Sequence, residues 1–267
     1  MTSRDQVIAL IKFKLLKKNN KNNIDNLLSL NDNIQQLNFI PKRIFQTHKS
    51  LDYISSKPKL FSALMSWLRF TPEYNYYFFD DEDMDRFMRE KMSENIYKAF
   101  LKLPLPVMKA DLWRYCIVHY YGGIYTDIDT VCKVNINYFM RHGSQLVIAP
   151  ENDVHLCQWT FLAPPKSPIL NMIIGLSVIR ILSIKQFKGE HIIHYLTGPG
   201  VFTDGIEQYL KMNNKITYPN RIKYHNYYDK NLLYVFSEYD FSFNLIYHLY
   251  TGADEDGWTK DRDRLFK

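Results

Sequence analysis

The sequence has few cysteines and lacks a long apolar segment. Three cysteines occur in 267 residues, at Cys116, Cys132 and Cys157, and none of them belongs to a Cys-x-x-Cys pair. The chain also lacks an Asn-x-Ser/Thr glycosylation signal. An odd number of scattered cysteines argues against a disulfide framework. We therefore expect reduced thiols and a cytoplasmic location.

The N-terminal region has no segment that could span a membrane. Residues 7–16 are apolar, but Lys12 and Lys14 interrupt them, so this stretch is too short and too charged. No small-residue cleavage site follows it. Residues 17–26 are rich in Lys and Asn and indicate a loop. Two interpretations of residues 1–38 stay open. A short helix packed on the domain is favoured over a basic amphipathic segment with weak affinity for a membrane surface.

The composition fits one large folded domain with a basic surface. Apolar residues make up 46% of the chain and aromatic residues 15%. The net charge of +6 suggests an anionic partner, such as nucleic acid, a membrane surface or nucleotide phosphates. Aromatic and basic residues alternate at residues 224–228, but no motif of a nucleic-acid reader accompanies them. We expect core strands there and no nucleic-acid partner.

The segment that organises the chain is residues 107–132, which predict a helix, a glycine stop and a strand. Gly122 and Gly123 supply the left-handed conformation that commonly ends a helix. Before these glycines, apolar residues recur at helical spacing and form one stripe: Ala110, Trp113, Ile117 and Tyr120.

After the glycines, residues 124–131 alternate with a period of two, as in a β-strand. Asp127 and Asp129 would then point to the same side, roughly 7 Å apart along the strand. Two such carboxylates repel each other unless a cation neutralises them, and Mg²⁺ or Mn²⁺ prefers oxygen ligands. Five Asp-x-Asp triplets occur, but only this one lies in a β-branched run after an apolar helix. The other four are interpreted as solvated turns or helix starts.

The central segment resembles a known enzyme family. The strings Lys109-Ala-Asp-Leu-Trp-Arg-Tyr and Tyr-Gly-Gly-Ile-Tyr-Thr-Asp-Ile-Asp129 resemble the sugar-nucleotide site of the DXD-containing glycosyltransferases of family 32. More distantly, they are similar to the glucosyltransferase domains of large clostridial toxins. The resemblance implies an α/β fold of the GT-A type, a Rossmann-like nucleotide-sugar-binding domain with a mixed central sheet flanked by helices. Residues 39–267 would form this catalytic domain, and residues 1–38 a basic helical lead.

Shorter stretches extend the resemblance on the nucleotide side. Residues 39–49 are predicted as the first strand and contain the family's opening pattern, Ile-Pro-Lys-x-Ile-x-Gln-Thr. This pattern implies that Gln46 and Thr47 lie near the nucleotide. His48 stands where the family usually has Trp. Asp80 follows an aromatic strand and corresponds to an aspartate near the base, although its acidic neighbours primarily indicate a helix N-terminus.

Two further stretches extend it toward the sugar and the metal. Thr197 and Gly198 belong to a Thr-Gly-Pro-Gly string that resembles the family's loop beside the donor sugar, and that predicts a tight turn. Residues 247–258 resemble the closing motif His-x-x-x-Gly-Ser-Trp, which implies that His248 completes the metal shell and Trp258 covers the diphosphate. This chain lacks the Ser and carries an acidic insert. Other metal ligands therefore stay open, namely Asp254 and Asp256.

The remaining patterns are read as structural. Strands are predicted at residues 145–150 and 158–165, and a long apolar helix at residues 168–182. His191 and His194 have the spacing of metal ligands on a helix, but neither Cys nor Glu accompanies them. An ordinary pair of histidines is the favoured interpretation.

Chemistry and resemblance together predict a metal-dependent, retaining transferase. It would move a hexosyl group from a UDP- or GDP-sugar to a glycan or protein acceptor. Asp129, helped by Asp127, would hold Mn²⁺ or Mg²⁺ as a Lewis acid for the leaving diphosphate. Asp111 would accept hydrogen bonds from the donor sugar, and Arg114 would contact the sugar or the phosphates. The expected donor-binding residues also include Lys109 and Tyr125.

Four alternatives remain at this level. The same residues would serve a sugar-nucleotide-hydrolysing protein, a toxin-like transferase that modifies a protein side chain, or a binding module without activity. A nucleic-acid-binding protein would explain the basic charge, but would show a steep salt dependence of binding to random DNA. Without the Gly-Gly and Asp-x-Asp that follow, Asp111 and Arg114 would be read as an ordinary ion pair on a helix surface.

Overall fold

In the computed structural model of this protein, the described residues are 3–30, 39–141, 143–189, 191–229, 231–237, 241 and 245–249. Residues 250–258 of the predicted closing motif lie outside these ranges, and with them the candidates Asp254, Asp256 and Trp258.

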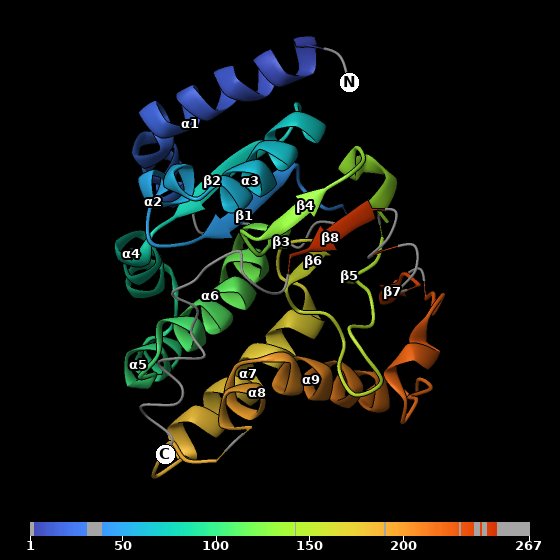
Figure 1. Ribbon diagram of the computed structural model, residues 1–267. Coiled ribbons are helices and arrows are strands. Elements are labelled where there is room, and N and C mark those ends of the chain that lie inside the picture. The colour runs from blue at the N-terminus through green and yellow to red at the C-terminus, as the bar shows by residue number, and fades with distance from the viewer. Residues whose placement is uncertain are drawn as a thin grey trace.

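A mixed six-stranded sheet forms the centre of the molecule, with the strand order β2-β1-β3-β6-β5-β7 (Figure 1). Its strands are β1 (Arg43–Thr47), β2 (Asn75–Phe79), β3 (Gly123–Thr126), β5 (Leu146–Ile148), β6 (Thr160–Ala163) and β7 (Leu233–Val235). β1 runs parallel to β2 and β3, β6 runs antiparallel to β3 and β5, and β7 runs parallel to β5. The carboxyl ends of five strands therefore meet the amino end of β6 at one edge of the sheet.

A second, two-stranded sheet lies beside that edge. It pairs β4 (Thr130–Cys132) with β8 (Ile246–His248) in antiparallel register, so Thr130 lies opposite His248. β4 follows β3 after only three residues, whereas β8 comes from more than a hundred residues later in the chain (Figure 1). This pairing brings the C-terminal part of the described chain to the end of β3.

Helices cover both faces of the sheet. They are α1 (Ser3–Leu28), α2 (Leu51–Ser56), α3 (Pro58–Phe70), α4 (Asp81–Lys91), α5 (Glu94–Lys102), α6 (Pro106–Tyr121), α7 (Pro168–Ser183), α8 (Ile192–Leu196) and α9 (Pro199–Met212), with short 3-10 turns at Ile136–Phe139 and Arg221–Tyr224. Alternate strand residues enter two separate cores. Phe45 and Tyr125 pack with α4 to α9, and Ile44 and Ile124 pack with α1 to α3. The α/β architecture with a mixed sheet is as predicted.

The N-terminal segment is helical throughout, so the loop expected at residues 17–26 is wrong. Leu16, Asn20, Ile24 and Leu27 are buried at helical spacing along α1. The Asn20 side chain donates to the Phe78 carbonyl (2.6 Å) and accepts from the Phe78 amide (3.1 Å). Helix α1 thus covers the free edge of strand β2, and this tertiary contact outweighs the low helix propensity of asparagine. The domain division at residue 38 stays a prediction.

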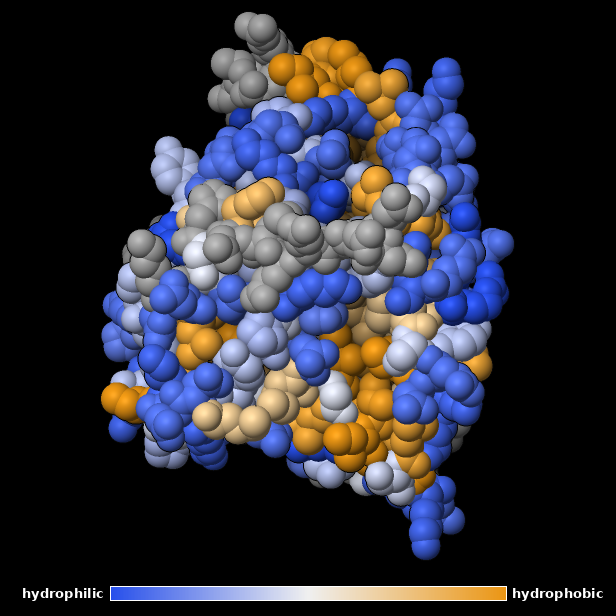
Figure 2. Space-filling view, turned by 180° about the vertical axis from the view of Figure 1, so that it is seen from behind, coloured by the Kyte–Doolittle hydropathy of each residue, from blue (hydrophilic) through white to orange (hydrophobic). Residues whose placement is uncertain are grey.

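The first half of α1 carries exposed apolar residues among its exposed polar ones. Val7, Ile11 and Leu15 recur at helical spacing and each exposes about half of its surface. Figure 2 shows apolar residues at the top of the molecule, where Figure 1 places α1. Among the described helices, none combines the length and hydropathy needed to cross a bilayer. Weak association of this segment with a membrane surface stays a prediction.

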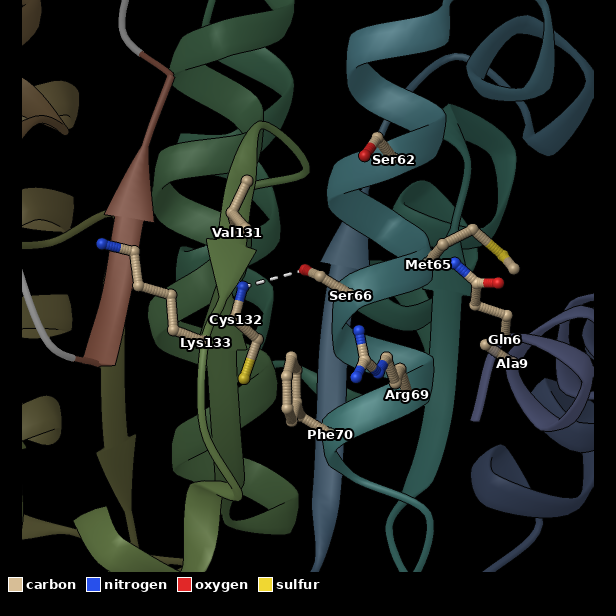
Figure 3. Close-up of a pocket in the computed structure, with 10 residues that line it drawn as sticks. All are labelled: Gln6, Ala9, Ser62, Met65, Ser66, Arg69, Phe70, Val131, Cys132 and Lys133. Atoms are coloured by element: carbon tan, nitrogen blue, oxygen red, sulfur yellow. Dashed lines mark hydrogen bonds between the residues drawn. The ribbon is translucent and has the colours of Figure 1, made fainter. Parts of the chain in front are cut away.

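A cavity of about 440 Å³ opens between α1, α3 and β4 (Figure 3). Ser66 Oγ on α3 accepts a hydrogen bond from the Cys132 amide on β4 (2.9 Å) at its wall. Met65 and Phe70 supply apolar surface, and Arg69 supplies positive charge. Among the described residues, its lining contains no Asp, Glu or His, so it lacks the carboxylates that hold Mg²⁺ or Mn²⁺. This cavity is not the site that the paired carboxylates form.

Helix α6 leads into the site and is buried on nearly all sides, not along one stripe as predicted. Its glycine stop is confirmed. Gly122 has a φ of 66°, and a Cβ there would meet Pro165 Cδ at 2.5 Å. Gly123 has a φ of 130°, and a Cβ would meet the Arg43 carbonyl oxygen at 2.6 Å. Only glycine fits this close approach of α6 to β1.

His119, near the end of α6, links protein stability to pH. Burial and the nearby Lys166 ammonium lower the pKa of His119 to about 4, although Ser167 O lies 3.1 Å from its Nδ1. The unfolded state therefore binds a proton more readily, so stability falls as pH drops from 6.5 toward 4, by at most roughly 3 kcal/mol.

We expect His119→Gln to reduce this fall in the free energy of unfolding, measured by chemical denaturation at a series of pH values. The exposed His225→Gln should keep the wild-type slope, and equal slopes in all three proteins would refute the linkage.

Candidate active site

The Asp-x-Asp pair lies in a turn between two strands and not inside one strand. β3 ends at Thr126, Asp127 to Asp129 form the turn, and β4 begins at Thr130. Thr130 closes this turn, because its hydroxyl donates to the Asp127 carbonyl (2.6 Å) and its amide to the same oxygen (3.2 Å). The strand expected over residues 124–131 is therefore wrong in its middle. The turn still aims both carboxylates at one place.

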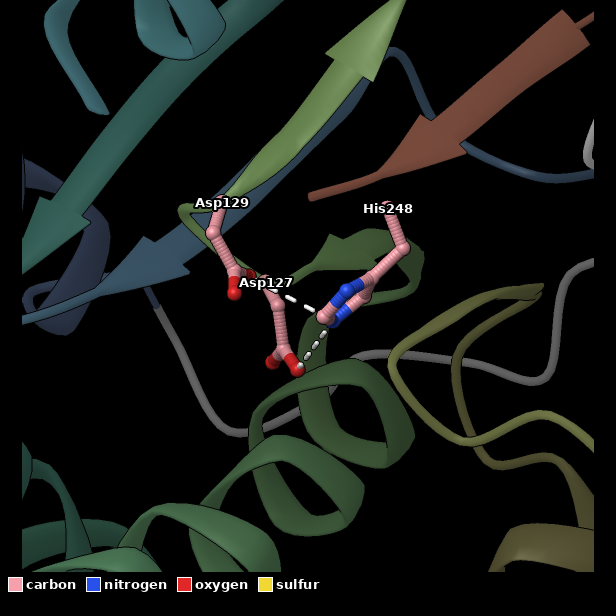
Figure 4. Close-up of side chains that lie close together, drawn as sticks. All are labelled: Asp127, Asp129 and His248. Atoms are coloured by element: carbon pink, nitrogen blue, oxygen red, sulfur yellow. Dashed lines mark ion pairs between the residues drawn. The ribbon is translucent and has the colours of Figure 1, made fainter. Parts of the chain in front are cut away.

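His248 completes a group of three potential metal ligands (Figure 4). One ligand atom from each of Asp127, Asp129 and His248 lies within 4.8 Å of the others. His248 Nε2 is 3.4 Å from Asp129 Oδ1 and 3.9 Å from Asp127 Oδ2. The β4–β8 pairing positions this histidine, and the Trp159 ring packs edge-on against it at 5.0 Å. Two carboxylates and an imidazole form a donor set that fits a divalent cation.

Arg114 links this group to helix α6. Its guanidinium contacts Asp111 Oδ1 at 2.9 Å through Nη2, and Asp127 Oδ1 at 3.2 Å through Nη1. It also lies over the Tyr125 ring, 4.5 Å from the centroid. The Tyr125 hydroxyl donates to Asp127. The side chain of Arg114 is only 6% exposed, so the pair Asp111–Arg114 is not an ordinary surface ion pair.

Asp111 is held by a polar network that comes from three segments. It accepts hydrogen bonds from the Thr197 hydroxyl (3.1 Å) and from the Gln158 amide (3.3 Å). Tyr115, one turn along α6, donates to Gln158 Oε1 and to the Thr197 carbonyl (2.7 Å). The structure thus brings Thr197 directly to Asp111, and the expected place of Thr197 beside a donor sugar stays a prediction.

Burial dominates the electrostatics of these groups. It raises the pKa of Asp111 to about 6, despite the opposing charge of Arg114. Burial also raises the pKa of Asp129, and the neighbouring Asp127 carboxylate raises it further. For Asp127, burial is outweighed by Arg114 and His248, so its pKa is lowered. The two carboxylates repel each other, and both interact with His248. They raise the pKa of His248, although burial acts to lower it.

The residues predicted to lie near the nucleotide, Gln46, Thr47 and Asp80, lie at the same edge of the sheet as the DXD turn. Gln46 is buried and its amide donates to the Asp127 carbonyl (3.0 Å), so it supports the Asp-x-Asp turn directly. Thr47 donates to the Phe79 carbonyl (2.8 Å) and ties β1 to β2. Asp80 caps helix α4, where it accepts from the Asp83 amide (2.9 Å), as its acidic surroundings indicate. Their contacts with a nucleotide stay a prediction.

The other predicted positions take varied places. The ammonium group of Lys109 lies over the Phe100 ring, 5.2 Å from the centroid. Gly198 is the N-cap of α9, so the tight turn expected at Gly198–Gly200 is instead the start of a helix. A Cβ at Gly200 would meet the His194 carbonyl at 2.7 Å, which explains the glycine at this position. Strands were expected at residues 224–228, but the chain forms the end of a 3-10 turn and a loop there, and Tyr228 alone pairs as in a strand, with Tyr234 of β7.

Sequence reasoning missed three residues around this site. Tyr115 is four residues after Asp111, and this spacing on one helix face was a usable signal. Gln158 lies two residues before strand β6, and nothing in the neighbouring sequence indicates that it faces Asp111. Glu151 follows β5, and burial raises its pKa to about 7, with the charges of His248, Asp127 and Arg114 acting on it as well. Trp159 was expected to be packed, and it is 5% exposed.

Comparisons with known proteins agree with this geometry. Residues 58–146 match the family model described as a glycosyltransferase sugar-binding region containing a DXD motif. The initiation-specific alpha-1,6-mannosyltransferase of Schizosaccharomyces pombe is 31% identical over 202 residues, which cover 64% of this chain and 49% of the relative. Its counterpart in Candida albicans is 28% identical over 219 residues, covering 68% and 56%. The chain spans about half the length of these curated relatives.

A solved structure shows the same fold. The PaToxG glycosyltransferase matches with a TM-score of 0.50 at 16% identity, over 75% of this chain and 81% of that chain. At this identity the likeness concerns architecture alone. It confirms the GT-A type of α/β domain expected from the sequence. The DXD turn lies inside the segment that matches the family model, so residues 58–146 of this chain are similar to the DXD-containing sugar-binding region of glycosyltransferases.

Proposed function

We propose that this protein is a metal-dependent, retaining hexosyltransferase that uses a nucleoside-diphosphate sugar. One observation carries the proposal: the Asp127–Asp129–His248 group lies next to the buried Asp111–Arg114 pair at the ligand-binding edge of an α/β sheet. A cation site beside a hydrogen-bonding carboxylate suits a substrate with a diphosphate at one end and hydroxyl groups at the other.

The cation that fits this site is Mn²⁺ or Mg²⁺. Asp127, Asp129 and His248 would hold it. When bound, it would neutralise the charge that develops on the leaving diphosphate. Asp127 and Asp129 are half-buried and close together, and burial together with the Asp127 charge raises the pKa of Asp129, which supports a cation as their third partner. The mixed oxygen and nitrogen donor set suits Mn²⁺ at least as well as Mg²⁺.

The residues on α6 would bind the sugar. Asp111, when ionised, would accept hydrogen bonds from sugar hydroxyls, and Arg114 would direct its remaining donors at the sugar or the phosphates. In the transfer, an acceptor oxygen forms a bond to C1 of the sugar as the bond from C1 to the phosphate oxygen breaks. The nucleoside diphosphate leaves with the electron pair, and the acceptor proton passes to the leaving phosphate or to water.

The relatives that are named as mannosyltransferases make mannose the first sugar to consider, with GDP-mannose as its activated form. A glycan or a protein side chain is the proposed acceptor. The alternative is a protein that binds or hydrolyses the sugar nucleotide without transferring the sugar. The same site geometry would serve that activity, since water can take the place of the acceptor.

The test is a panel of UDP- and GDP-hexoses, incubated without acceptor, in which release of the nucleoside diphosphate is measured with Mn²⁺ and with EDTA. We expect release from one donor class, dependent on the metal and slow because water replaces the acceptor. Addition of glycosides or peptides should then increase release if the protein is a transferase, and leave it unchanged if it is a hydrolase. If no donor releases its nucleoside diphosphate, and calorimetry detects neither nucleotide nor metal binding, the enzyme assignment is wrong.

A further inference from the structure

Glu151 lies at the same edge of the sheet as the metal-ligand group. It follows β5 by three residues, and the antiparallel register between β5 and β6 pairs Val147 with Leu162. Beyond that pair the register shifts, because Pro150 pairs with Leu156, so Glu151 lies opposite His155. Gln158, whose side-chain amide contacts Asp111, follows in the same segment before β6. The carboxyl end of β5 and the amino end of β6 point toward the end of β3, where Asp127 begins the DXD turn.

The turn that carries Glu151 is firmly held. The Glu151 amide donates to the His155 carbonyl (3.0 Å). Asn152 Oδ1 accepts from the amides of Val154 (2.8 Å) and His155 (2.7 Å). The Leu156 amide donates to a hydroxyl on α9 (2.9 Å). A turn with these contacts presents its side chains in a defined position.

One oxygen of the Glu151 carboxyl group is left without a donor by the part of the chain that the structure describes. Glu151 Oε2 is fully buried and has no hydrogen bond among the described residues. A buried carboxylate oxygen without a donor is unfavourable, and such an atom in a native structure calls for a missing ligand. The metal does not fill that role, because the group of ligand atoms within 4.8 Å of one another includes His248 but not Glu151.

The order of the strands indicates which ligand Glu151 meets. Along the edge, β2 and β1 carry Asp80 and Gln46, β3 carries the DXD turn, and β6 and β5 follow on the other side. A nucleotide on the β1–β2 side, with its diphosphate at the metal, leaves the β6–β5 side for the group that attacks the sugar. Glu151 lies on this far side.

We propose that Glu151 is an acceptor-binding residue, whose Oε2 accepts a hydrogen bond from a hydroxyl of a sugar acceptor. This inference rests on the proposed transferase function. It names the acceptor class as a hydroxyl-rich molecule, because a carboxylate binds hydroxyl donors far better than apolar groups. The raised pKa of Glu151 agrees with a carboxyl group that is buried and awaits a donor.

The experiment compares Glu151→Gln with the wild type, using the donor identified above and methyl α-hexosides as acceptor probes. The exchange keeps shape, but it replaces one carboxylate oxygen by a hydrogen-bond donor. We expect kcat/KM for the acceptor to fall about 10- to 100-fold, the loss typical of a hydrogen bond to a charged group. The KM for the donor and the acceptor-free release should stay within about twofold. Asp153→Asn, which removes an exposed carboxylate from the same turn, is the matched control and should behave as wild type.

Several results would overturn the inference. If Glu151→Gln lowers acceptor-free release and donor binding as much as transfer, Glu151 serves the donor and not the acceptor. If transfer is unchanged, Glu151 does not bind the acceptor. If no hexoside accepts the sugar, hexoside binding is measured by saturation-transfer NMR with the nucleoside diphosphate and Mn²⁺ bound. The wild type should bind a hexoside and the variant should not. No binding to the wild type would also contradict the assignment. A wild type without donor turnover or binding would instead refute the proposed function. The unfolding midpoint and donor binding check the fold of each variant.

Discussion

Replacement of Asp129 by Asn should lower metal-dependent release of the nucleoside diphosphate by at least about 10²-fold, and the double change with Asp127→Asn should abolish it. The reason is the geometry of the turn, where both carboxylates and His248 supply ligand atoms within 4.8 Å of one another. An amide can still coordinate weakly, but it carries no charge to balance a divalent cation. The rate of nucleoside diphosphate release is measured at a fixed donor concentration over a range of Mn²⁺ concentrations.

Stability measurements separate loss of the metal from loss of the fold. Burial and the Asp127 charge both raise the pKa of Asp129, so its ionised form is unfavourable in the metal-free protein. Asp129→Asn should therefore leave the unfolding midpoint of the metal-free protein unchanged or raise it. The increase in midpoint that Mn²⁺ causes in the wild type should disappear.

The matched control is Asp81→Asn, an exposed aspartate of another Asp-x-Asp triplet, in the first turn of α4. It should keep both the activity and the response to Mn²⁺. Wild-type turnover by a folded Asp127→Asn, Asp129→Asn double variant would remove the DXD turn from the active site.

Arg114→Ala should destabilise the protein strongly as well as inactivate it. The guanidinium contacts Asp111 at 2.9 Å and Asp127 at 3.2 Å while its side chain is 6% exposed. Its removal leaves the buried Asp111 carboxylate without a counter-charge and leaves the half-buried Asp127 with His248 as its cationic partner. Breaking a buried ion pair in this way costs about 3–5 kcal/mol. Part of that loss should be recovered at low pH, where Asp111, with a pKa of about 6, becomes neutral. Chemical denaturation at two pH values measures both effects.

Arg114→Lys tests the geometry separately from the charge. A lysine ammonium keeps the positive charge but cannot span Asp111 and Asp127 as a planar fork does. We expect the stability loss to be smaller than for alanine, while kcat/KM for the donor falls at least about tenfold. The control is Arg89→Lys, because the exposed Arg89 side chain on α4 pairs with Asp85 only at the surface. It should change neither the stability nor kcat/KM for the donor. Full activity of Arg114→Lys would place Arg114 outside the donor site.

The local sequence predicted the parts of the site that depend on neighbours in the chain. Gly122 and Gly123 mark the end of α6 because their backbone conformation excludes a side chain. Asp111 and Arg114 share a helix face because of their spacing, and Asp80 caps α4 because acidic side chains favour a helix N-terminus. The resemblance of the central motif led correctly to the α/β fold of the GT-A type.

The errors occurred where a distant contact outweighs local preference. Residues 17–26 form a helix because Asn20 pairs with the backbone of β2, which an Asn-rich stretch does not reveal by itself. The predicted strand through Asp127 breaks because the Thr130 hydroxyl and amide close a turn on the Asp127 carbonyl. Alternation with a period of two cannot distinguish a continuous strand from two strands joined by a short turn.

The chain's own order of residues specified the chemistry of the site: a pair of carboxylates, an arginine and the glycines that let the backbone pass. The family resemblance also named His248, but only tertiary structure brings the distant residues to these groups. His248 reaches the carboxylates through the β4–β8 pairing, and Gln158 and Glu151 through the antiparallel β5–β6 arrangement. These partners lie up to about 120 positions away in sequence, and the sheet brings them together because strand pairing depends on hydrogen-bond register and not on distance along the chain.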